Sequence, residues 1–437
     1  MSVSAKQRSN RPVYPAYKPS GVAWLGDVPE HWEVRRLKYT ADLINVKVDG
    51  ADNDLPYTGL EHIESWTGKR IAPNGDTTSE GQAKLYRRGD VLFGKLRPYL
   101  AKAHAADSDG ICTGELLVLH PKVVQQKFLV DYVLNPDFVA IVDSSTYGAK
   151  MPRANWDFIG NLPALIPPGD EQRAIAAFLD RETARIDALI EKKRRQIEVL
   201  QEKRSALVSH AVTKGLDPHA PMKDSGIEWL GEIPEHWEVK RIKQLGAIRY
   251  GLGEPPEYVG DGLPFIRATD IKRGKIDLNA VRKVRREDVP WSRRPTLQLG
   301  EILVVRSGAY TGDSAIVTKD VAGSIAGYDM VLTVTKAHSP FVAWVLLSRY
   351  MLEGQIYLER MRAAQPHLNA EELGGFVILM PPIDEQRQIT DALKCETSKL
   401  DAMADRIGDS IIMLRDLRTA LISAAVSGKI DVRKEII

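Results

Sequence analysis

Residues 20–38 read SGVAWLGDVPEHWEVRRLK, and residues 225–243 repeat this stretch as SGIEWLGEIPEHWEVKRIK. Thirteen of the nineteen positions are identical, and most of the others exchange similar side chains. A second pair follows, because the 51 residues from Pro167 match those from Pro381 without a gap and with 21 identities. The chain is therefore an internal repeat, in which a globular block and a long segment occur twice in alternation.

Composition indicates an ordinary globular protein. The chain has 437 residues, 43% of them hydrophobic and 27% charged, which suggests two to four domains. No apolar run reaches the roughly 20 residues of a membrane span, and no signal-peptide pattern opens the chain. Two distant cysteines, Cys112 and Cys395, predict neither a disulfide framework nor a metal cluster, so we expect a cytoplasmic location. Residues 1–19 are polar and predict a flexible N-terminal arm.

The two long segments predict two long helices. Residues 170–213 contain neither Pro nor Gly, and at 1.5 Å per residue they would span about 65 Å. Apolar residues recur every seven positions in both copies, which indicates a helical seam that needs a partner helix. The obvious partner is the other copy, packed antiparallel; two core helices of separate domains would explain the length poorly. The seam positions are Leu179, Ile186, Ile190, Ile197, Leu200 and Leu207, and in the second copy Leu393, Leu400, Ile407, Ile411, Leu414 and Leu421.

Several repeated polar and aromatic residues have alternative interpretations. The Asp-Glu-Gln sequences that begin at Asp170 and Asp384 could cap the helices or form a partner surface. His31 and His236 occupy matching Pro-Glu-His-Trp positions, which favours a structural role over catalysis. The tryptophans of the repeated stretches are predicted to be packing anchors. The basic segment at residues 281–294 is either a DNA-binding surface or a solvated charged face.

Each globular block is predicted to contain both α-helices and β-strands. Apolar runs bounded by Gly and Asp predict strands within residues 55–63, 89–105 and 111–121, and within 263–271, 300–317 and 324–334. Helical spacing follows in residues 128–142 and 341–358. Identity between the copies falls sharply in residues 39–151 and 244–365, which predicts two readers of related design and different targets.

Catalytic signatures are absent from the sequence. There is no P-loop, no Gly-rich dinucleotide fingerprint and no amino-methyltransferase motif. The net charge of +2 does not by itself indicate nucleic acid. A long chain without a catalytic constellation favours a binding or assembly protein.

The repeats resemble the specificity (S) subunits of type I restriction–modification enzymes. The resemblance rests on the two Trp-Leu-Gly stretches, on PPGDEQ and PPIDEQ opening the long segments, and on residues 210–231, which join the halves. It implies an α+β chain with two target recognition domains, separated by an antiparallel coiled coil that sets an unread DNA spacer. The domains implied are a flexible arm at 1–19, recognition domains at 20–166 and 216–380, a central helix at 167–215 and a C-terminal helix and tail at 381–437.

The same resemblance implies function and partners. Each recognition domain would read one half of a bipartite, asymmetric double-stranded DNA target. Two methylation subunits and two restriction subunits would bind, and S-adenosylmethionine, ATP and magnesium would reside on them, with no catalytic site or cofactor on this chain. The alternative is a degenerate scaffold of the same family without sequence preference.

Residues that contact DNA are expected on loops beside the repeated strands, where phosphate contacts hold register and base contacts specify sequence. In the first block the candidates are Lys69, Arg70, Lys95, Arg97, Tyr99 and Lys102. In the second block they are Arg267, Arg293, Arg294, Arg306, Ser307, Tyr310 and Thr311.

Overall fold

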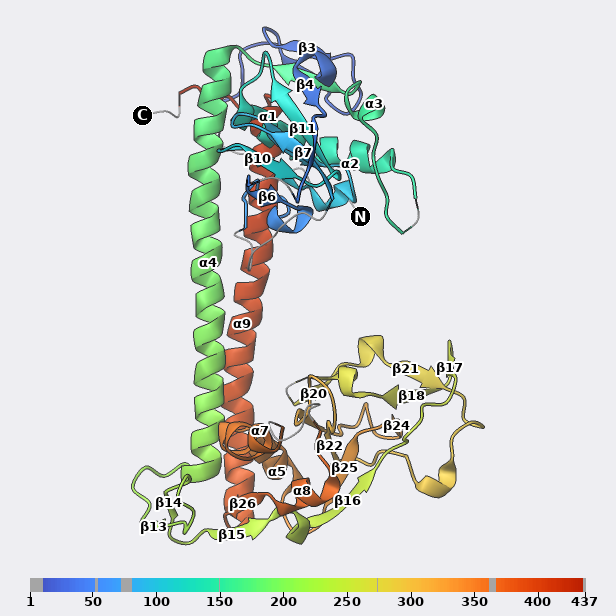
Figure 1. Ribbon diagram of the computed structural model, residues 1–437. Coiled ribbons are helices and arrows are strands. Elements are labelled where there is room, and N and C mark those ends of the chain that lie inside the picture. The colour runs from blue at the N-terminus through green and yellow to red at the C-terminus, as the bar shows by residue number, and fades with distance from the viewer. Residues whose placement is uncertain are drawn as a thin grey trace. The chain divides into compact units, whose positions relative to one another are not determined.

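The computed structural model describes residues 11–51, 54–71, 81–148, 150–272, 274–360 and 367–434 (Figure 1). Contacts divide the chain into two compact units. Unit one is Met1–Lys193 with Asp409–Ile437, and unit two is Arg194–Gly408. The division falls inside both long helices, so each unit combines one globular block with a part of each helix.

Unit one contains two four-stranded sheets. The first is antiparallel in the order β4-β11-β8-β9, and the second has the order β5-β7-β10-β6 with β10 and β6 parallel. Two further antiparallel pairs join β1 to β2 and β3 to β12. The strands are β1 Tyr17–Pro19, β2 Asp27–Pro29, β3 Glu33–Arg36, β4 Ala41–Ile44, β5 Lys47–Asp49, β6 Tyr57–Thr58, β7 Gln82–Tyr86, β8 Val91–Gly94, β9 Ala103–Ala105, β10 Gly110–Cys112, β11 Leu116–Pro121 and β12 Pro163–Ile166.

Unit two repeats the first sheet and alters the second. Its antiparallel sheet, β16-β25-β22-β23, corresponds strand for strand to that of unit one. The second sheet of unit two has the order β17-β21-β18-β24. Its β21 pairs with β18, whereas β7 of unit one pairs with β10. The strands are β13 Met222–Asp224, β14 Glu232–Pro234, β15 Glu238–Arg241, β16 Gly246–Tyr250, β17 Tyr258–Val259, β18 Leu263–Ile266, β19 Ile271–Lys272, β20 Lys275–Ile276, β21 Arg282–Val284, β22 Ile302–Val304, β23 Ser314–Ile316, β24 Ile325–Ala326, β25 Met330–Val334 and β26 Val377–Met380.

Short helices complete both units, and the predicted mixed fold is confirmed. Unit one has α1 Gln126–Val133, α2 Pro136–Ser144 and α3 Trp156–Ile159, with 3-10 turns η1 Leu37–Tyr39, η2 Leu60–His62 and η3 Pro98–Leu100. Unit two has α5 Ser339–Leu346, α6 Arg349–Met351, the π-helical turn η8 Leu352–Ile356, α7 Tyr357–Arg360 and α8 Ala370–Gly375. Its 3-10 turns are η4 Ile242–Gln244, η5 Ala268–Asp270, η6 Leu278–Ala280 and η7 Trp291–Arg293.

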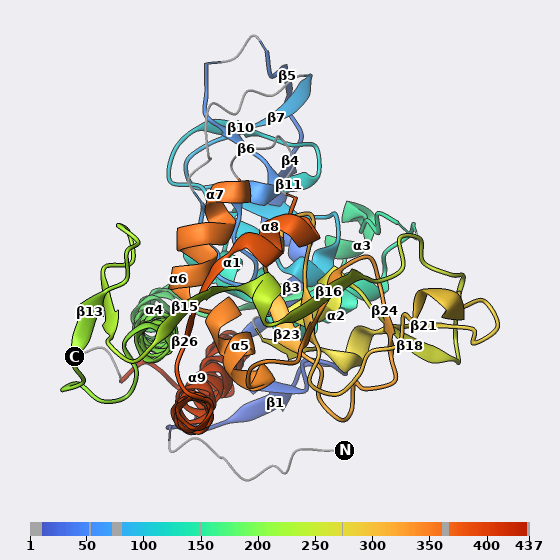
Figure 2. The same ribbon diagram turned by 90° about the horizontal axis from the view of Figure 1, so that it is seen from below.

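The two predicted long helices are α4 (Gly169–Lys214, 46 residues) and α9 (Ile383–Val426, 44 residues). Within each unit, the segment of α4 lies beside the segment of α9 (Figures 1 and 2). In unit one Arg418 of α9 pairs with Asp187 of α4, and in unit two Arg204 of α4 pairs with Asp401 of α9. A later residue of one helix therefore meets an earlier residue of the other, as an antiparallel coiled coil requires. All twelve seam positions are buried or half-buried.

The repeated sequence stretches contact each other within each unit. The Glu171 carboxylate accepts hydrogen bonds from the Trp32 indole at 2.9 Å and the Tyr14 hydroxyl at 3.1 Å, and it lies 2.6 Å from His31 Nε2. In unit two Glu385 accepts from the Trp237 indole at 3.2 Å and lies 2.7 Å from His236 Nε2. The Pro-Glu-His-Trp and Asp-Glu-Gln sequences are therefore two halves of one structural contact.

Gln172 and Gln386 complete this contact and explain why the motifs recur together. The Gln172 amide accepts from Gln125 N and donates to Pro167 O. Gln386 likewise accepts from His338 N and donates to Pro381 O. The sequence suggested that the Asp-Glu-Gln sequences cap the helices or form a partner surface. Neither role describes these two glutamines or the glutamates beside them. They bind the globular block instead of capping the helix, and Glu171, Gln172 and Gln386 are buried.

Two local expectations need adjustment. Residues 11–19 are packed rather than a flexible arm, because Tyr14 is buried, β1 pairs with β2 and Tyr17 donates to Gly428 O; residues 1–10 lie outside the described residues. Trp32 and Trp237 are buried anchors, as predicted, but Trp229 is half exposed and stacks on Tyr350. No helix in the described ranges is long and apolar enough to cross a membrane.

Candidate nucleic-acid interface

The turn that follows β8 presents two of the predicted side chains in unit one. Arg97 and Ala101 adopt left-handed backbone conformations, at φ 48° and 45°, on either side of the 3-10 turn η3. Arg97 N donates to Pro152 O at 2.8 Å, and its guanidinium donates to Lys150 O at 3.4 Å. Arg97 and Tyr99 are both exposed. The turn therefore holds a cation and a phenol at the surface on an anchored backbone.

The turn that follows β22 occupies the same place in unit two. Leu368 N donates to Arg306 O, as Ala154 N donates to Lys95 O in unit one. Isolated bridges also join Ser307 to His367 and Leu96 to Arg153. Lys95 and Arg306 are therefore corresponding positions, and so are Arg153 and His367.

The side chains at these corresponding positions make different contacts. In unit two the Arg306 guanidinium carbon lies 4.6 Å from the Tyr250 ring centre and 4.3 Å from that of Tyr328. In unit one Arg153 instead forms a two-pronged ion pair with Glu115, with nitrogen–oxygen distances of 3.0–3.1 Å. The backbone frame is shared, but the chemistry that it displays differs between the units.

Three of the candidates in unit one have partners within their own unit. The Lys69 ammonium lies 2.6 Å from Asp187 Oδ2, and Arg70 donates to Tyr57 O at 3.3 Å. Lys102 donates to Leu60 O at 2.6 Å, and burial lowers the pKa of its ammonium. These cations have structural contacts, which leaves Lys95, Arg97 and Tyr99 as the group gathered at the β8 turn.

The unit two candidates divide in a similar way. Arg267 pairs with buried Asp270 at 2.8 Å, and Thr311 is buried with its hydroxyl donating to Gly308 O. Arg306, Ser307 and Tyr310 share the β22 turn, where Tyr310 is exposed. Arg293 and Arg294 are exposed at η7, which is distant from that turn in the sequence. Within the part of the chain that the structure describes, no hydrogen bond or ion pair joins them to the turn.

Tyr250, Tyr328, His367 and Asp329 were missed by sequence reasoning. They come from the end of β16, the start of β25 and the segment before α8, so only the fold brings them to Arg306. Asp329 Oδ1 accepts from Arg306 N at 3.2 Å, and burial raises the pKa of Asp329 to about 6. The one available signal was the matching Pro-x-x-Asn sequence that begins at Pro152 and Pro366, because residues 152–154 and 367–368 contact this turn.

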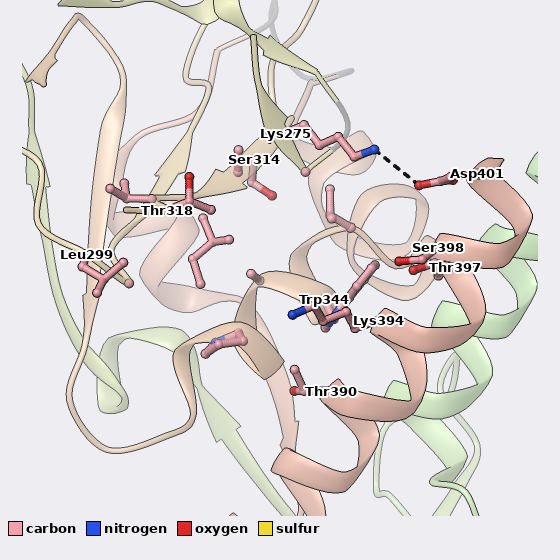
Figure 3. A pocket seen from close by; sticks show the side chains of 18 of the residues that line it. Lys275, Leu299, Ser314, Thr318, Trp344, Thr390, Lys394, Thr397, Ser398 and Asp401 are labelled. Atoms are coloured by element: carbon pink, nitrogen blue, oxygen red, sulfur yellow. Dashed lines mark hydrogen bonds and ion pairs between the residues drawn. The ribbon is translucent and has the colours of Figure 1, made fainter. Parts of the chain in front are cut away.

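Unit two also contains a cavity of about 630 Å³ between α5, β23 and α9 (Figure 3). Its walls are mostly apolar and include Trp344, and Lys275 pairs with Asp401 at its edge at 3.5 Å. No group of three His, Cys, Asp or Glu in the described ranges could hold a metal ion. The exposed cations at the β8 and β22 turns therefore form a candidate binding surface, and the cavity is a separate feature of unit two.

Comparisons with known proteins agree with this geometry. The family model described as "Type I restriction modification DNA specificity domain" matches residues 234–407. The chain is 23% identical to the type I restriction enzyme EcoBI specificity subunit of Escherichia coli over 68% of this chain and 64% of that protein. It is 23% identical to the MjaVIII specificity subunit of Methanocaldococcus jannaschii over 84% of this chain and 86% of that protein.

A solved structure shows the same fold. It comes from work on complex assembly and conformational transition of the type I R-M system, and it matches with a TM-score of 0.68 at 19% identity. The match covers 91% of this chain and 98% of that one. In its repeat, its paired helices and these relatives, the chain is similar to the type I restriction–modification DNA specificity subunits.

Proposed function

We propose that the chain is the DNA sequence-specificity subunit of a type I restriction–modification complex. The observation that carries the proposal is the pair of corresponding turns after β8 and β22. Their backbones share one hydrogen bond and one β-bridge, while Lys95 and Arg153 in unit one are replaced by Arg306 and His367 in unit two. A shared frame with different side chains suits two readers of unlike half-sites, because sequence is read by side chains that reach base edges.

The division of labour follows the repeat. Residues 20–166 and 216–380 are the two target recognition domains, and the coiled coil of α4 and α9 sets the unread spacer between half-sites. Lys95, Arg97 and Tyr99 in unit one, and Arg306, Ser307 and Tyr310 in unit two, are the contacts to DNA. Arg293 and Arg294 are additional phosphate contacts. A chain that works on cellular DNA is cytoplasmic.

Catalysis belongs to partner subunits. Two methylation subunits supply S-adenosylmethionine chemistry, and two restriction subunits supply ATP- and magnesium-dependent cleavage. Exposed apolar side chains on the long helices support a partner surface, because such patches mark interaction sites. In unit one these are Leu189, Ile412, Met413 and Leu417, which are 43–69% exposed.

Methylated adenines mapped genome-wide, in cells with and without this chain, test the function directly. The expected result is a single bipartite sequence that is methylated only when the chain is present. Exchange of residues 39–165 for those of a relative should then change one half-site and leave the other unaltered. A change in both half-sites would contradict the two-reader arrangement. Assembly without any sequence preference would favour the degenerate scaffold instead.

A further inference from the structure

The Arg306 guanidinium lies close to two tyrosine rings. Its guanidinium carbon lies 4.6 Å from the Tyr250 ring centre and 4.3 Å from the Tyr328 ring centre, both within the range of cation–π attraction. Tyr250 and Tyr328 are themselves 42% and 44% exposed. The two rings therefore flank a guanidinium at the surface of unit two and do not bury it in the core.

The remaining contacts restrain the Arg306 side chain and its backbone. Its NH2 group lies 3.3 Å from His367 Nε2, and the Arg306 backbone is bound at N by Asp329 Oδ1 and at O by Leu368 N. Arginine normally loses rotamer freedom when it binds, and this loss weakens binding. Here the protein has already restricted that freedom.

Most of the donors on this guanidinium remain available. A guanidinium carries five N–H donors and no acceptor. Among the residues that the structure describes, His367 is the single hydrogen-bond partner of the Arg306 side chain, and Nε is buried without one. Among the described residues no carboxylate forms an ion pair with the guanidinium: Asp329, whose charge interacts with that of Arg306, accepts its hydrogen bond from the Arg306 backbone N. A restrained fork of donors without an ion-pair partner is suited to a planar ligand with two adjacent acceptors.

We propose that Arg306 is a guanine-binding site that specifies one base pair of the half-site read by unit two. Guanine presents O6 and N7 as adjacent acceptors in the major groove, and an arginine fork binds both. No other base edge offers this pair of acceptors to a donor-only side chain. The inference rests on the proposed function and adds to it the base that is read and the residue that reads it.

Unit one lacks this site, which restricts the effect to one half-site. Lys95 occupies the position of Arg306, and it has an ammonium in place of a planar fork. Arg153, at the position of His367, is neutralised by its two-pronged pairing with Glu115. Removal of the Arg306 fork should therefore leave recognition by unit one intact.

The test is the methylation sequence of the assembled complex with wild-type, Arg306→Lys and Arg306→Gln chains. The wild type should require guanine at one position that both variants relax, with discrimination lowered about tenfold and the other half-site unchanged. Tyr328→Ala should relax the same position, whereas Tyr328→Phe should retain it because the ring face remains. Arg406→Gln, at an exposed arginine of α9, is the control for loss of charge.

The possible results distinguish a failure of the guanine site from a failure of the proposed function. An unchanged sequence with Arg306→Lys, or a loss of methylation that is equal at all targets, as a phosphate contact predicts, overturns the guanine site and leaves the proposed function standing. A wild-type complex without a bipartite sequence refutes the proposed function itself. The intact half-site reports folding in every variant, and Tyr328→Ala gives the same readout if Arg306→Gln does not assemble.

Discussion

Arg418 Nε lies 3.1 Å from Asp187 Oδ1, which joins the last turns of α9 to the middle of α4 within unit one. Arg204 and Asp401 make the same contact at the same distance in unit two, and both residues are offset by 214 positions from their counterparts. A lysine of each globular block, Lys69 or Lys275, binds the other oxygen of the aspartate. The pseudo-symmetry of the sequence is therefore reproduced as a pseudo-symmetric ion-pair cluster.

Arg418→Ala should destabilise the protein by about 3 kcal/mol, because a buried ion pair and two buried hydrogen bonds are lost and Asp187 keeps only Lys69 as a partner. The Arg418 side chain is only 8% exposed, and it also donates to the carbonyl oxygens of Trp66 and Thr67. Arg195→Ala, which breaks an exposed pair with Glu198, should cost less than about 0.5 kcal/mol. Urea denaturation measures both, and equal small losses would contradict a structural role for Arg418.

Glu171→Gln should cost more stability than Glu385→Gln, although the two residues are repeat counterparts. Glu171 is 6% exposed and faces Tyr14, His31, Trp32 and, at 3.5 Å, Arg433, whereas Glu385 is 24% exposed and faces His236 and Trp237. We expect a loss of about 2 kcal/mol for Glu171→Gln and about half that for Glu385→Gln. Thermal unfolding of both variants decides the order, and a reversed order would refute the explanation by burial.

Asp131→Asn should stabilise unit one at pH 8 and have no effect near pH 4. Burial, with a further contribution from Asp180, raises the pKa of Asp131 to about 7. An unfolded aspartate loses its proton near pH 4, so Asp131 lowers stability progressively as the pH rises from 4 to 7 and by a constant amount above. We expect a gain of about 2 kcal/mol at pH 8.

The measurement is the difference in unfolding free energy between this variant and the wild type across that pH range. Asp137→Asn serves as the matched control, because Asp137 is exposed in the first turn of the neighbouring helix α2. A gain for Asp131→Asn that is constant with pH would show that charge burial is not its origin.

An insertion of four residues after Arg204, matched by four before Asp401, should lengthen the DNA spacer without altering either half-site. The matched design is needed because these two residues pair across the antiparallel helices. One added turn is about 6 Å, which corresponds to one or two base pairs. Mapping of methylated sites gives the spacer, and an unchanged spacer would refute the coiled coil as its determinant.

Met413→Glu should weaken assembly with the methylation subunit without unfolding the chain. Met413 is 69% exposed on α9, beside Ile412 and one turn before Leu417, so a charge there is tolerated by the free chain but must be desolvated in an apolar interface. Co-purification measures the loss, with Arg415→Glu on the same helix as control for charge. Equal retention by both variants would place the partner surface elsewhere.

Repeats and helical periodicity determined a large part of this architecture. The stretch without Pro or Gly at 170–213 predicted α4 to within a residue or two, and the repeat predicted α9 within residues 381–437 without giving its end. An uninterrupted helix needs only local hydrogen bonds and one continuous apolar face. Predicted strands around β8, β11, β22 and β25 were found for a similar reason, since buried strands read as short apolar runs. The seam residues could be assigned because register along a helix follows from spacing alone.

Only the tertiary structure decided which side chains share a site. Lys69 and Lys102 were candidates for DNA contact from the sequence, yet long-range contacts with Asp187 and Leu60 O occupy them. Tyr250, Tyr328 and His367 are separated by many residues from Arg306 and from each other, and they meet because β16, β25 and β22 are neighbours in one sheet. Pairing between distant strands follows from the packing of the whole unit, and no local pattern in the sequence encodes it.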